Sequence, residues 1–491
     1  MALHARLVAP PPEPRHEWPW HQAKWSAVPC NVLWQGDRRM EAETYLSSGY
    51  GLRVAIEGRP GGWKRFDKLA RTWQPSRLKG IQVSPEFGTP FLAATQVFDI
   101  RPVPRKWLAL ERTDDAAQRF VQPGKILVTC SGVVGRATLS HAPHENTLIT
   151  HDLLRVEPFD DEMWGWVYAY LRSPQARAVM IGAHYGHIIK HLETTHLDAL
   201  PIPVVRSQIA AGFKRTLEKI LDLRNRGYQL ALEAEARFER PFSPLQVKDW
   251  GESGFSVRAS DAFFEGRRRF EAASHNPGVA VIRRHLTKKS EGFVTLRDAG
   301  YKIWLPGRFK RIPAEDGIEL VESSSVFECN PDFEKRIAEG DFGDDYQGRV
   351  KAGWLLMARS GQIYGLNGNV GFATVAYEGK VVSDDLIRIA PSTDCALKAG
   401  YLFVALSHPL FGRPLVKSLA YGSSIPHIDV ADLLTFEVVR LPHSEEEAIA
   451  DLAEESAAKR AQADVLEREL AADAGKLIDR FLAGDMREFN S

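Results

Sequence analysis

The chain has little cysteine, no long apolar run and no excess of charge of either sign. Its four cysteines, Cys30, Cys130, Cys329 and Cys395, stand far apart, with no Cys-x-x-Cys pair and no Cys/His cluster at zinc spacing. We therefore expect neither a structural zinc site nor a disulfide framework. No stretch approaches the roughly 20 uninterrupted apolar residues of a membrane helix, and the N-terminus lacks the layout of a signal peptide. These absences favour a cytoplasmic protein.

The charge balance limits how the chain can bind a polyanion. Lysine plus arginine equals aspartate plus glutamate, 63 of each, so the formal net charge is zero. A neutral chain has no general attraction to nucleic acid. Any such contact must use local basic patches or a basic partner.

An internal repeat organises the chain. Arg38–Ala42 recurs as Arg268–Ala272, and Gly124–Gly132 recurs as Gly353–Gly361. Further blocks follow in the same order, with offsets between 229 and 236: 151–156 with 384–389, 168–174 with 403–409, and 186–192 with 422–428. The extra residues of the second copy fall in a Gly-containing turn, where hairpin loops vary. The repeat predicts two copies of one unit.

Each copy has the pattern of a small α+β domain. In the first copy, 126–129, 137–139 and 153–156 are typical of short strands, and 166–183 has the apolar spacing of a helix. Residues 200–205, with two prolines, then lead out of the globular part.

Each copy is followed by a long segment without proline, from Ser207 to about Glu239 and from Ser444 to about Leu482. A helix of about 35 residues is about 50 Å long, which overruns a domain of this size. The two helices could pair antiparallel and hold two globular heads apart; the alternative is two ordinary surface helices packed on their own domains. The positions at heptad-like spacing in the second segment are Ile449, Leu452, Ser456, Lys459, Ala463, Leu466 and Leu470.

The chain resembles the specificity subunits of type I restriction-modification systems over nearly its whole length. The resemblance lies in a duplicated order of short motifs, which in the first copy includes Gly124-Lys125-Ile126-Leu127, Ser131-Gly132 and Ser173-Pro174. It implies two α+β target-recognition domains, each followed by a long helix, the two helices forming an antiparallel coiled coil. The expected boundaries are an N-terminal extension over 1–34, recognition domain 1 over 35–205, a central spacer helix over 206–245, recognition domain 2 over 246–441 and a C-terminal spacer helix over 442–485.

The resemblance also implies partners: double-stranded DNA, methyltransferase (M) subunits that carry AdoMet, and motor-nuclease (R) subunits. The chain itself has no AdoMet-binding glycine turn, no Asn/Asp-Pro-Pro-Tyr/Phe block and no GxxxxGK[ST] phosphate loop. We therefore expect a non-catalytic subunit with no metal or cofactor of its own. We call the long helix that follows each recognition domain its exit helix. Glu445-Glu446-Glu447 stands where the family has a Gln near the start of the exit helix, which leaves open a related phage-defence complex.

Two heads held about 50 Å apart would contact one duplex more than one helical turn, about 34 Å, apart. The predicted target is therefore bipartite, with an unread gap. Base edges in the major groove are read by some side chains while others hold phosphates. For each candidate the alternative role is a solvated turn residue or a local cap. The candidates are Thr129, Ser131, Arg136, Lys190 and His191 in the first copy and Arg359, Ser360, Gln362, Ser423, Ser424 and His427 in the second.

Other charged groups allow different interpretations. The basic runs 38–39 and 267–269 either contact DNA or pair with Glu41 and Glu271 inside each unit. His151-Asp152 and Asp384-Asp385 precede a predicted strand in both copies, which fits a structural turn better than acid-base chemistry or a metal site.

Two functions compete with DNA reading. Pro331-Asp332 followed by Glu378-Gly379-Lys380 contains the residue types of a metal-dependent nuclease, but the long gap and the lack of a counterpart in the first copy favour a chance match. The other competitor is a duplicated adaptor that binds RNA or protein through the same two heads.

Overall fold

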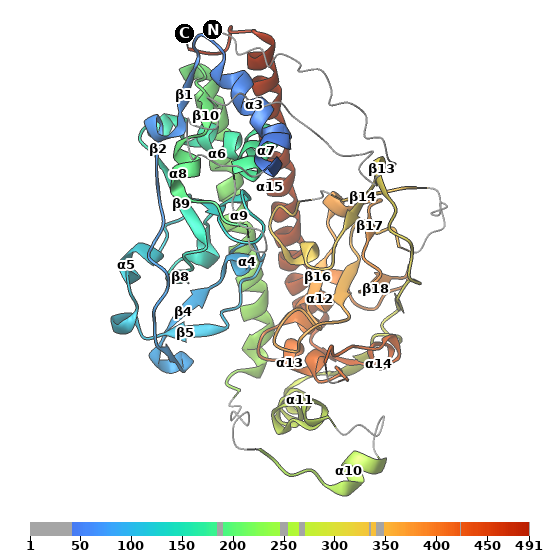
Figure 1. The fold of residues 1–491 in the computed structure, drawn as a ribbon. Helices are drawn as coiled ribbons and strands as arrows, with labels where there is room; N and C mark the ends of the chain where they lie inside the picture. The colour runs from blue at the N-terminus through green and yellow to red at the C-terminus, as the bar shows by residue number, and fades with distance from the viewer. Residues whose placement is uncertain are drawn as a thin grey trace, which may run out of the picture. The chain divides into compact units, whose positions relative to one another are not determined.

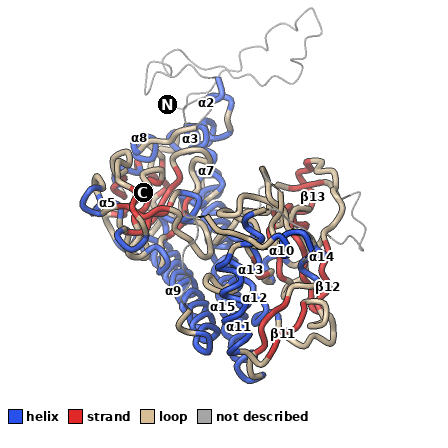
Figure 2. The backbone as a smooth tube through the Cα atoms, turned by 90° about the horizontal axis from the view of Figure 1, so that it is seen from below, coloured by secondary structure: helices blue, strands red, loops and turns tan. Residues whose placement is uncertain are grey.

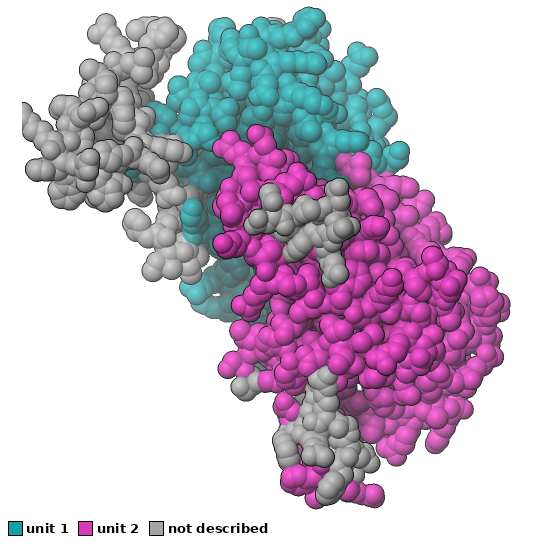
Figure 3. Space-filling model, turned by 90° about the vertical axis from the view of Figure 1, so that its right-hand side faces the viewer, with its two compact units in different colours: residues 1–222, 466–491 teal, residues 223–465 magenta. Residues whose placement is uncertain are grey.

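The computed structural model describes residues 42–183, 190–245, 254–264, 271–332, 335–339, 348–422 and 424–490. The predicted N-terminal extension, 1–34, and both basic runs, 38–39 and 267–269, lie outside these residues. The chain divides into two compact units, which Figure 3 colours separately: unit 1 is 1–222 with 466–491, and unit 2 is 223–465. None of the helices within the described ranges combines the length and the apolar character needed to span a bilayer.

Unit 1 is a mixed α and β structure built on two four-stranded sheets (Figure 1). One sheet has the order β2-β9-β6-β7 and is antiparallel throughout; the other has the order β3-β5-β4-β8, with β4 and β8 parallel. Strand β1 pairs with β10. The elements are α2 (Ala42–Leu46), α3 (Ser48–Glu57), β1 (Trp63–Arg65), β2 (Ala70–Trp73), β3 (Gln82–Val83), β4 (Thr89–Leu92), α4 (Ala94–Val97), β5 (Lys106–Leu108), α5 (Ala116–Arg119), β6 (Ile126–Thr129), β7 (Ala137–Leu139), β8 (Leu148–Ile149), β9 (Leu153–Pro158), α6 (Trp164–Arg172), α7 (Pro174–Ala183), α8 (Thr194–Asp198) and β10 (Pro201–Pro203).

The antiparallel sheet of unit 2 has the order β12-β18-β15-β16, in which the strands take the places of β2, β9, β6 and β7 of unit 1. Its second sheet, β14-β13-β17, again contains one parallel pair, β13 with β17, and β11 pairs with β19. The elements are α10 (Ala259–Phe264), α11 (Pro277–Lys289), β11 (Gly292–Thr295), β12 (Tyr301–Trp304), β13 (Pro313–Val321), β14 (Arg336–Ile337), β15 (Leu355–Ala358), β16 (Val370–Phe372), β17 (Val381–Val382), β18 (Leu386–Pro391), α12 (Ala399–Ser407), α13 (Gly412–Lys417), α14 (Val430–Leu434) and β19 (Glu437–Arg440).

The central strands are buried on both faces. Their sequences are therefore continuous apolar runs rather than an alternation of polar and apolar residues. In β15, Leu355 and Met357 belong to the core formed with α12 and α13, which lie beside the strands in Figure 2. Leu356 and Ala358 point to a second core on the opposite face. Successive side chains of a strand point to opposite faces, so one strand supports both cores.

The predicted strands of the first copy are confirmed as β6, β7 and the first part of β9. The single predicted helix over 166–183 is wrong, because the chain forms two helices, α6 and α7, that meet at Ser173 and Pro174. Proline has no N–H to donate and disfavours helical backbone at the residue before it. Ser173 is accordingly extended (φ −64°, ψ 147°), and its Oγ accepts the Ala176 N–H at 3.1 Å.

The two proline-free segments form α9 (Ser207–Glu239) and α15 (His443–Ala483), the longest described helices. At 1.5 Å per residue they measure about 50 and 60 Å. The predicted central helix, 206–245, is thus shorter at its C-terminal end, where a 3₁₀ turn (Arg240–Phe242) follows. The boundaries between the two compact units fall inside both helices, and the predicted domain boundaries stay a prediction.

Within unit 2 the C-terminal part of α9 contacts the N-terminal part of α15. Arg224 donates to Asp464 at 3.0 Å, and Arg237 makes two hydrogen bonds with Glu445 at 2.7 and 2.9 Å. Residue numbers rise along one helix as they fall along the other, so this stretch is antiparallel. Of the heptad-spaced positions, Ile449, Ser456, Ala463 and Leu470 are buried, while Leu452, Lys459 and Leu466 are half-buried.

Candidate nucleic-acid interface

In unit 1 the turn between β6 and β7 lies against the segment that precedes α8. Ser131 and His191 form an isolated antiparallel bridge, and Ser131 Oγ lies 3.2 Å from His191 Nδ1. The Gly132 N–H donates to the carbonyl of Lys190 at 3.2 Å, and the Leu192 N–H to that of Cys130 at 2.9 Å. The fold thus brings together two groups of predicted site residues that are about 60 positions apart in the sequence.

Unit 2 joins the corresponding segments in the same way. Ser360 and His427 form an isolated bridge, the Gly361 N–H donates to Pro426 at 3.2 Å, and the Ile428 N–H donates to Arg359 at 3.0 Å. The side chain of Gln362 adds a hydrogen bond from Nε2 to the carbonyl of Ser424 at 3.2 Å. We call each pair of segments a loop pair: 130–135 with 190–192 in unit 1, and 359–369 with 424–428 in unit 2.

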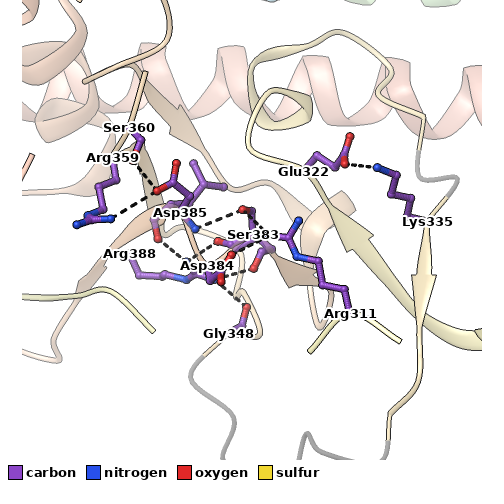
Figure 4. Close-up of polar contacts among 12 residues, drawn as sticks. Arg311, Glu322, Lys335, Gly348, Arg359, Ser360, Ser383, Asp384, Asp385 and Arg388 are labelled. Carbon is purple, nitrogen blue, oxygen red and sulfur yellow. Dashed lines mark hydrogen bonds and ion pairs between the residues drawn. The ribbon is translucent and has the colours of Figure 1, made fainter. Parts of the chain in front are cut away.

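A third segment, the turn before β9 or β18, supports each loop pair. The N–H of Cys130 donates to the carbonyl of Asp152, and that of Arg359 to the carbonyl of Asp385, both at 3.1 Å. In unit 2 the Asp385 carboxylate also accepts a hydrogen bond from Ser360 Oγ at 2.7 Å and lies 3.7 Å from the Arg359 guanidinium (Figure 4).

His151-Asp152 and Asp384-Asp385 lie in these turns. Asp152 Oδ2 accepts a hydrogen bond from Thr150 Oγ1 at 3.0 Å, and Asp384 Oδ1 accepts one from Arg311 at 2.7 Å. The His151 and Asp152 side chains are 3.6 Å apart. These local contacts agree with the predicted structural turn.

The individual candidates differ in exposure. Thr129 is only 6% exposed, and its Oγ1 accepts the Arg136 N–H at 2.9 Å, so its hydroxyl holds the hairpin turn. The Arg136 guanidinium lies over the ring of Phe98, 4.0 Å from the centroid. Ser131, Lys190, His191, Arg359, Ser360 and His427 are half-buried, Gln362 and Ser424 are exposed, and Ser423 lies outside the described residues.

Buried groups near the loop pairs have shifted pKa values. Burial, with a further contribution from Asp152, raises the pKa of the Cys130 thiol to about 11. A thiol with this pKa is protonated at neutral pH and therefore a poor nucleophile. Burial also lowers the pKa of Arg155, in β9, to about 10.

The nuclease-like residues of unit 2 are engaged in local structure. Glu378 Oε2 accepts the Ala352 N–H at 2.6 Å, and Lys380 forms an ion pair with Glu319. Across the described ranges, no group of three or more His, Cys, Asp or Glu side chains is placed to hold a metal ion.

Two residues near the loop pairs are not among the candidates predicted from the sequence. Gln74, just after β2, donates through Nε2 to the carbonyl of His151 at 2.7 Å. Arg311, which follows β12, donates to Asp384 at 2.7 Å and to Ser383 Oγ at 3.4 Å (Figure 4). The signal available in the sequence was the basic run Arg308–Arg311.

No protein-family model matches the chain, and no curated protein matches it. Solved structures do. The chain is similar to the type I restriction-modification S subunit from M. genitalium, with 12% identity, a TM-score of 0.30, and coverage of 87% of this chain and 96% of that one. It is similar to the HsdS subunit from Thermoanaerobacter tengcongensis, with 12% identity, a TM-score of 0.25, and coverage of 88% and 100%. A third match, with 14% identity, a TM-score of 0.26, and coverage of 87% and 99%, comes from a structure of type I R-M complex assembly and conformational transition.

Proposed function

We propose that this chain is the DNA-specificity subunit of a type I restriction-modification complex, or of a related phage-defence methylation complex, and that it reads a bipartite duplex target in the cytoplasm. The observation that carries the proposal is the loop pair. Each unit joins a hairpin turn to the segment that precedes α8 or α14 through matching backbone hydrogen bonds, from Gly132 to Lys190 and from Gly361 to Pro426.

Such a loop pair suits base reading. A duplex offers its donor and acceptor pattern in the major groove, and a reader must place several polar side chains there in a fixed geometry. In unit 2, Gln362 and Ser424 are exposed, and Arg359 and Ser360 are half-buried against Asp385. Backbone hydrogen bonds fix both segments of each pair, which limits the conformational entropy lost on binding.

The long helices would set the distance between the two recognition domains. We propose that α9 and α15 pair along their length as an antiparallel coiled coil, a stiff spacer between two recognition domains. The contacts Arg224–Asp464 and Arg237–Glu445 within unit 2 support this pairing. Heads separated by about 50 Å would contact sites more than one turn of DNA apart, leaving an unread gap between two half-sites.

The partners follow from what the chain does not carry. We propose that the chain is non-catalytic and that methyltransferase subunits dock on the helices, bring AdoMet and flip the target base; motor-nuclease subunits would join the same complex. From 444 to 482, α15 has more Asp and Glu than Lys and Arg, which suits protein docking better than DNA contact.

The test is selection from a random duplex library by this chain co-expressed with its genomically adjacent methyltransferase. The proposal predicts two short fixed motifs separated by a constant unread gap. An intact, AdoMet-bound complex that enriches no sequence would overturn it and favour the RNA- or protein-binding adaptor. Magnesium-dependent cleavage by the purified chain, lost in Asp332→Ala, would overturn the non-catalytic assignment.

A further inference from the structure

Each unit has a second duplicated loop, directly after the edge strand of its antiparallel sheet. In unit 1, β2 ends at Trp73 and continues into Gln74-Pro75-Ser76-Arg77-Leu78-Lys79-Gly80-Ile81; in unit 2, β12 ends at Trp304 and continues into Leu305-Pro306-Gly307-Arg308-Phe309-Lys310-Arg311-Ile312. Trp, Pro, Arg, Lys and Ile recur at the same places. We call 75–81 and 306–312 the basic arms.

In unit 1 the middle residue of the arm is anchored to the domain. Leu78 packs, partly buried, against the small core of Phe91, Leu108 and Leu148. The backbone on either side is also held, since the Asp115 carboxylate accepts the Ser76 N–H at 3.1 Å and the Asp114 N–H donates to the carbonyl of Lys79 at 3.1 Å.

The unit 1 arm has one more support. Arg119, fully buried, donates to the carbonyl of Ser76 at 2.8 Å and to that of Asp114 at 2.8 Å. The hydrogen bonds from Ser76 lower the pKa of Asp115 below its usual value. The arm is therefore a fixed surface rather than a free loop.

In unit 2 the matching residue, Phe309, packs against Leu320, Ile337 and Val381. The Ala338 N–H donates to the carbonyl of Ile312 at 2.8 Å. Both arms thus use an apolar side chain at the same position, between their Arg and their Lys, to dock on the second sheet of their unit.

The cations on either side of the anchor face solvent. Arg77 and Lys79 are exposed around half-buried Leu78, and Arg308 and Lys310 are exposed around half-buried Phe309. Among the described residues, these four side chains form no ion pair. A matching isoleucine, Ile81 or Ile312, is also more than half exposed next to each arm's cations.

A residue in or next to each arm contacts the turn that supports the loop pair of its unit. Gln74, next to the unit 1 arm, donates to the carbonyl of His151, and Arg311, within the unit 2 arm, donates to Asp384. These acceptors belong to the turns that hold Cys130 and Arg359 through the hydrogen bonds described above.

We propose that the two basic arms hold the DNA backbone, with Arg77 and Lys79 on phosphates at one half-site and Arg308 and Lys310 on phosphates at the other. The inference rests on the proposed function and adds to it the residues that fix each head on the duplex. Arginine binds a phosphate through its planar fork and lysine as a point charge. A pair of fixed cations beside a base-reading loop sets its register without reading sequence.

The test uses the complex of the full chain with its methyltransferase and a labelled duplex carrying the selected target, with a scrambled duplex as the second probe. The variants are Arg77→Ala/Lys79→Ala and Arg308→Ala/Lys310→Ala. Each lost phosphate contact lowers the slope of log affinity against log salt by about 0.9, on the order of tenfold in affinity at 0.1 M salt. We expect each double variant to lower the slope by about two, equally on both duplexes, and to keep the target preference.

The control is Lys64→Ala/Lys68→Ala, which removes two exposed cations that precede β2 rather than follow it. It should leave the slope within about half a unit of wild type, and thermal unfolding should show that every variant folds. In ethylation interference, each arm variant should lose the interference signal at the phosphates of one half-site and keep it at the other. A wild-type complex that selects a target while the arm variants keep its salt slope would overturn this inference alone. A variant that loses target preference but keeps the slope would also overturn it. A wild-type complex with no target would overturn the proposed function as well.

Discussion

Arg155 in β9 and Arg388 in β18 make the same hydrogen bonds in their two units. Both residues are buried, 1% and 0% exposed. Each donates through Nη1 to one carbonyl of the preceding turn, that of Thr150 or Ser383, and to the carbonyl of the first strand residue, Leu153 or Leu386. Nη2 donates to the carbonyl of Ile149 in unit 1 and to that of Val382 in unit 2. One buried side chain thus holds the turn that supports each loop pair.

Replacing either arginine should destabilise its unit. Arg155→Met or Arg388→Met removes at least three hydrogen bonds between one buried guanidinium and backbone carbonyls, so we expect a loss of about 3 kcal/mol or more in the free energy of unfolding. Urea unfolding measures it. Arg105→Met, at an exposed position, should change the value by less than about 0.5 kcal/mol. A loss below about 1 kcal/mol in the buried variants would show that the arginine does not hold the turn.

Two glycines allow close packing of helices within each unit: Gly165 where α6 meets α9, and Gly400 where α12 meets α15. A Cβ on Gly165 would lie 2.2 Å from the backbone of Lys214 in α9, and one on Gly400 would lie 2.3 Å from the carbonyl oxygen of Ala450 in α15. We expect Gly165→Ala and Gly400→Ala to lower unfolding free energy by about 1–3 kcal/mol through overpacking, despite the helix preference of alanine.

Gly212→Ala is the matched control for these variants. Gly212 is also helical, but a Cβ there meets nothing within 4 Å. Alanine should stabilise the chain at this site by up to about 1 kcal/mol. Three variants with the same sign of effect would disprove the close packing of head and exit helix.

The buried ion pair within unit 2 should matter more than the exposed one. Asp464 Oδ1 accepts hydrogen bonds from Arg224 at 3.0 Å and from the Asn330 N–H at 2.9 Å. Asp464→Ala leaves a buried guanidinium without this carboxylate, and we expect a loss of about 3–5 kcal/mol in unfolding free energy, with much of it recovered in Arg224→Met/Asp464→Leu. Glu445→Ala, which breaks the more exposed pair with Arg237, should cost no more than about 1 kcal/mol. Equal losses at both sites in urea unfolding would contradict this ranking.

The Cys130 thiol should make stability fall at high pH. Its pKa is raised from 9.0 to about 11 in the folded protein, so the folded state keeps a proton that the unfolded chain releases. The contribution is complete below pH 9 and is lost as the pH rises towards 11, a change on the order of 3 kcal/mol. Urea unfolding at pH 8 and pH 10.5 should show a smaller decrease for Cys130→Ala than for wild type. The same decrease in both proteins would refute the assignment.

Much of the local structure could be predicted from the sequence because local patterns determine it. Ile126–Thr129 is a short apolar run that ends in a Gly-containing turn, and 207–239 combines helical spacing with the absence of proline. The break at Pro174 was equally local, since proline cannot donate to a helix, and the continuous apolar spacing around it concealed the break.

The site depended on contacts that no local pattern contains. The hydrogen bonds between Gly132 and Lys190 join segments far apart in sequence, and only the fold places them together. Arg155 and Arg388 stand in apolar strands, where periodicity gives no reason to expect a buried cation that caps a turn. The basic arms could have been found from the sequence, because Trp, Pro, Arg, Lys and Ile recur after β2 and β12, but variable residues separate the matching positions.

In the proposed complex each unit reads its own half of one duplex. The most direct measurement is the duplex selection repeated with Arg359→Ala/Ser360→Ala/Gln362→Ala, which changes the loop pair of unit 2 alone. We predict that one half-site loses its base preference, by about 1–3 kcal/mol for each contact removed, while the other half-site and the gap length stay unchanged. Loss of both half-sites in a folded complex, or an unchanged target, would show that unit 2 does not read one half-site by itself.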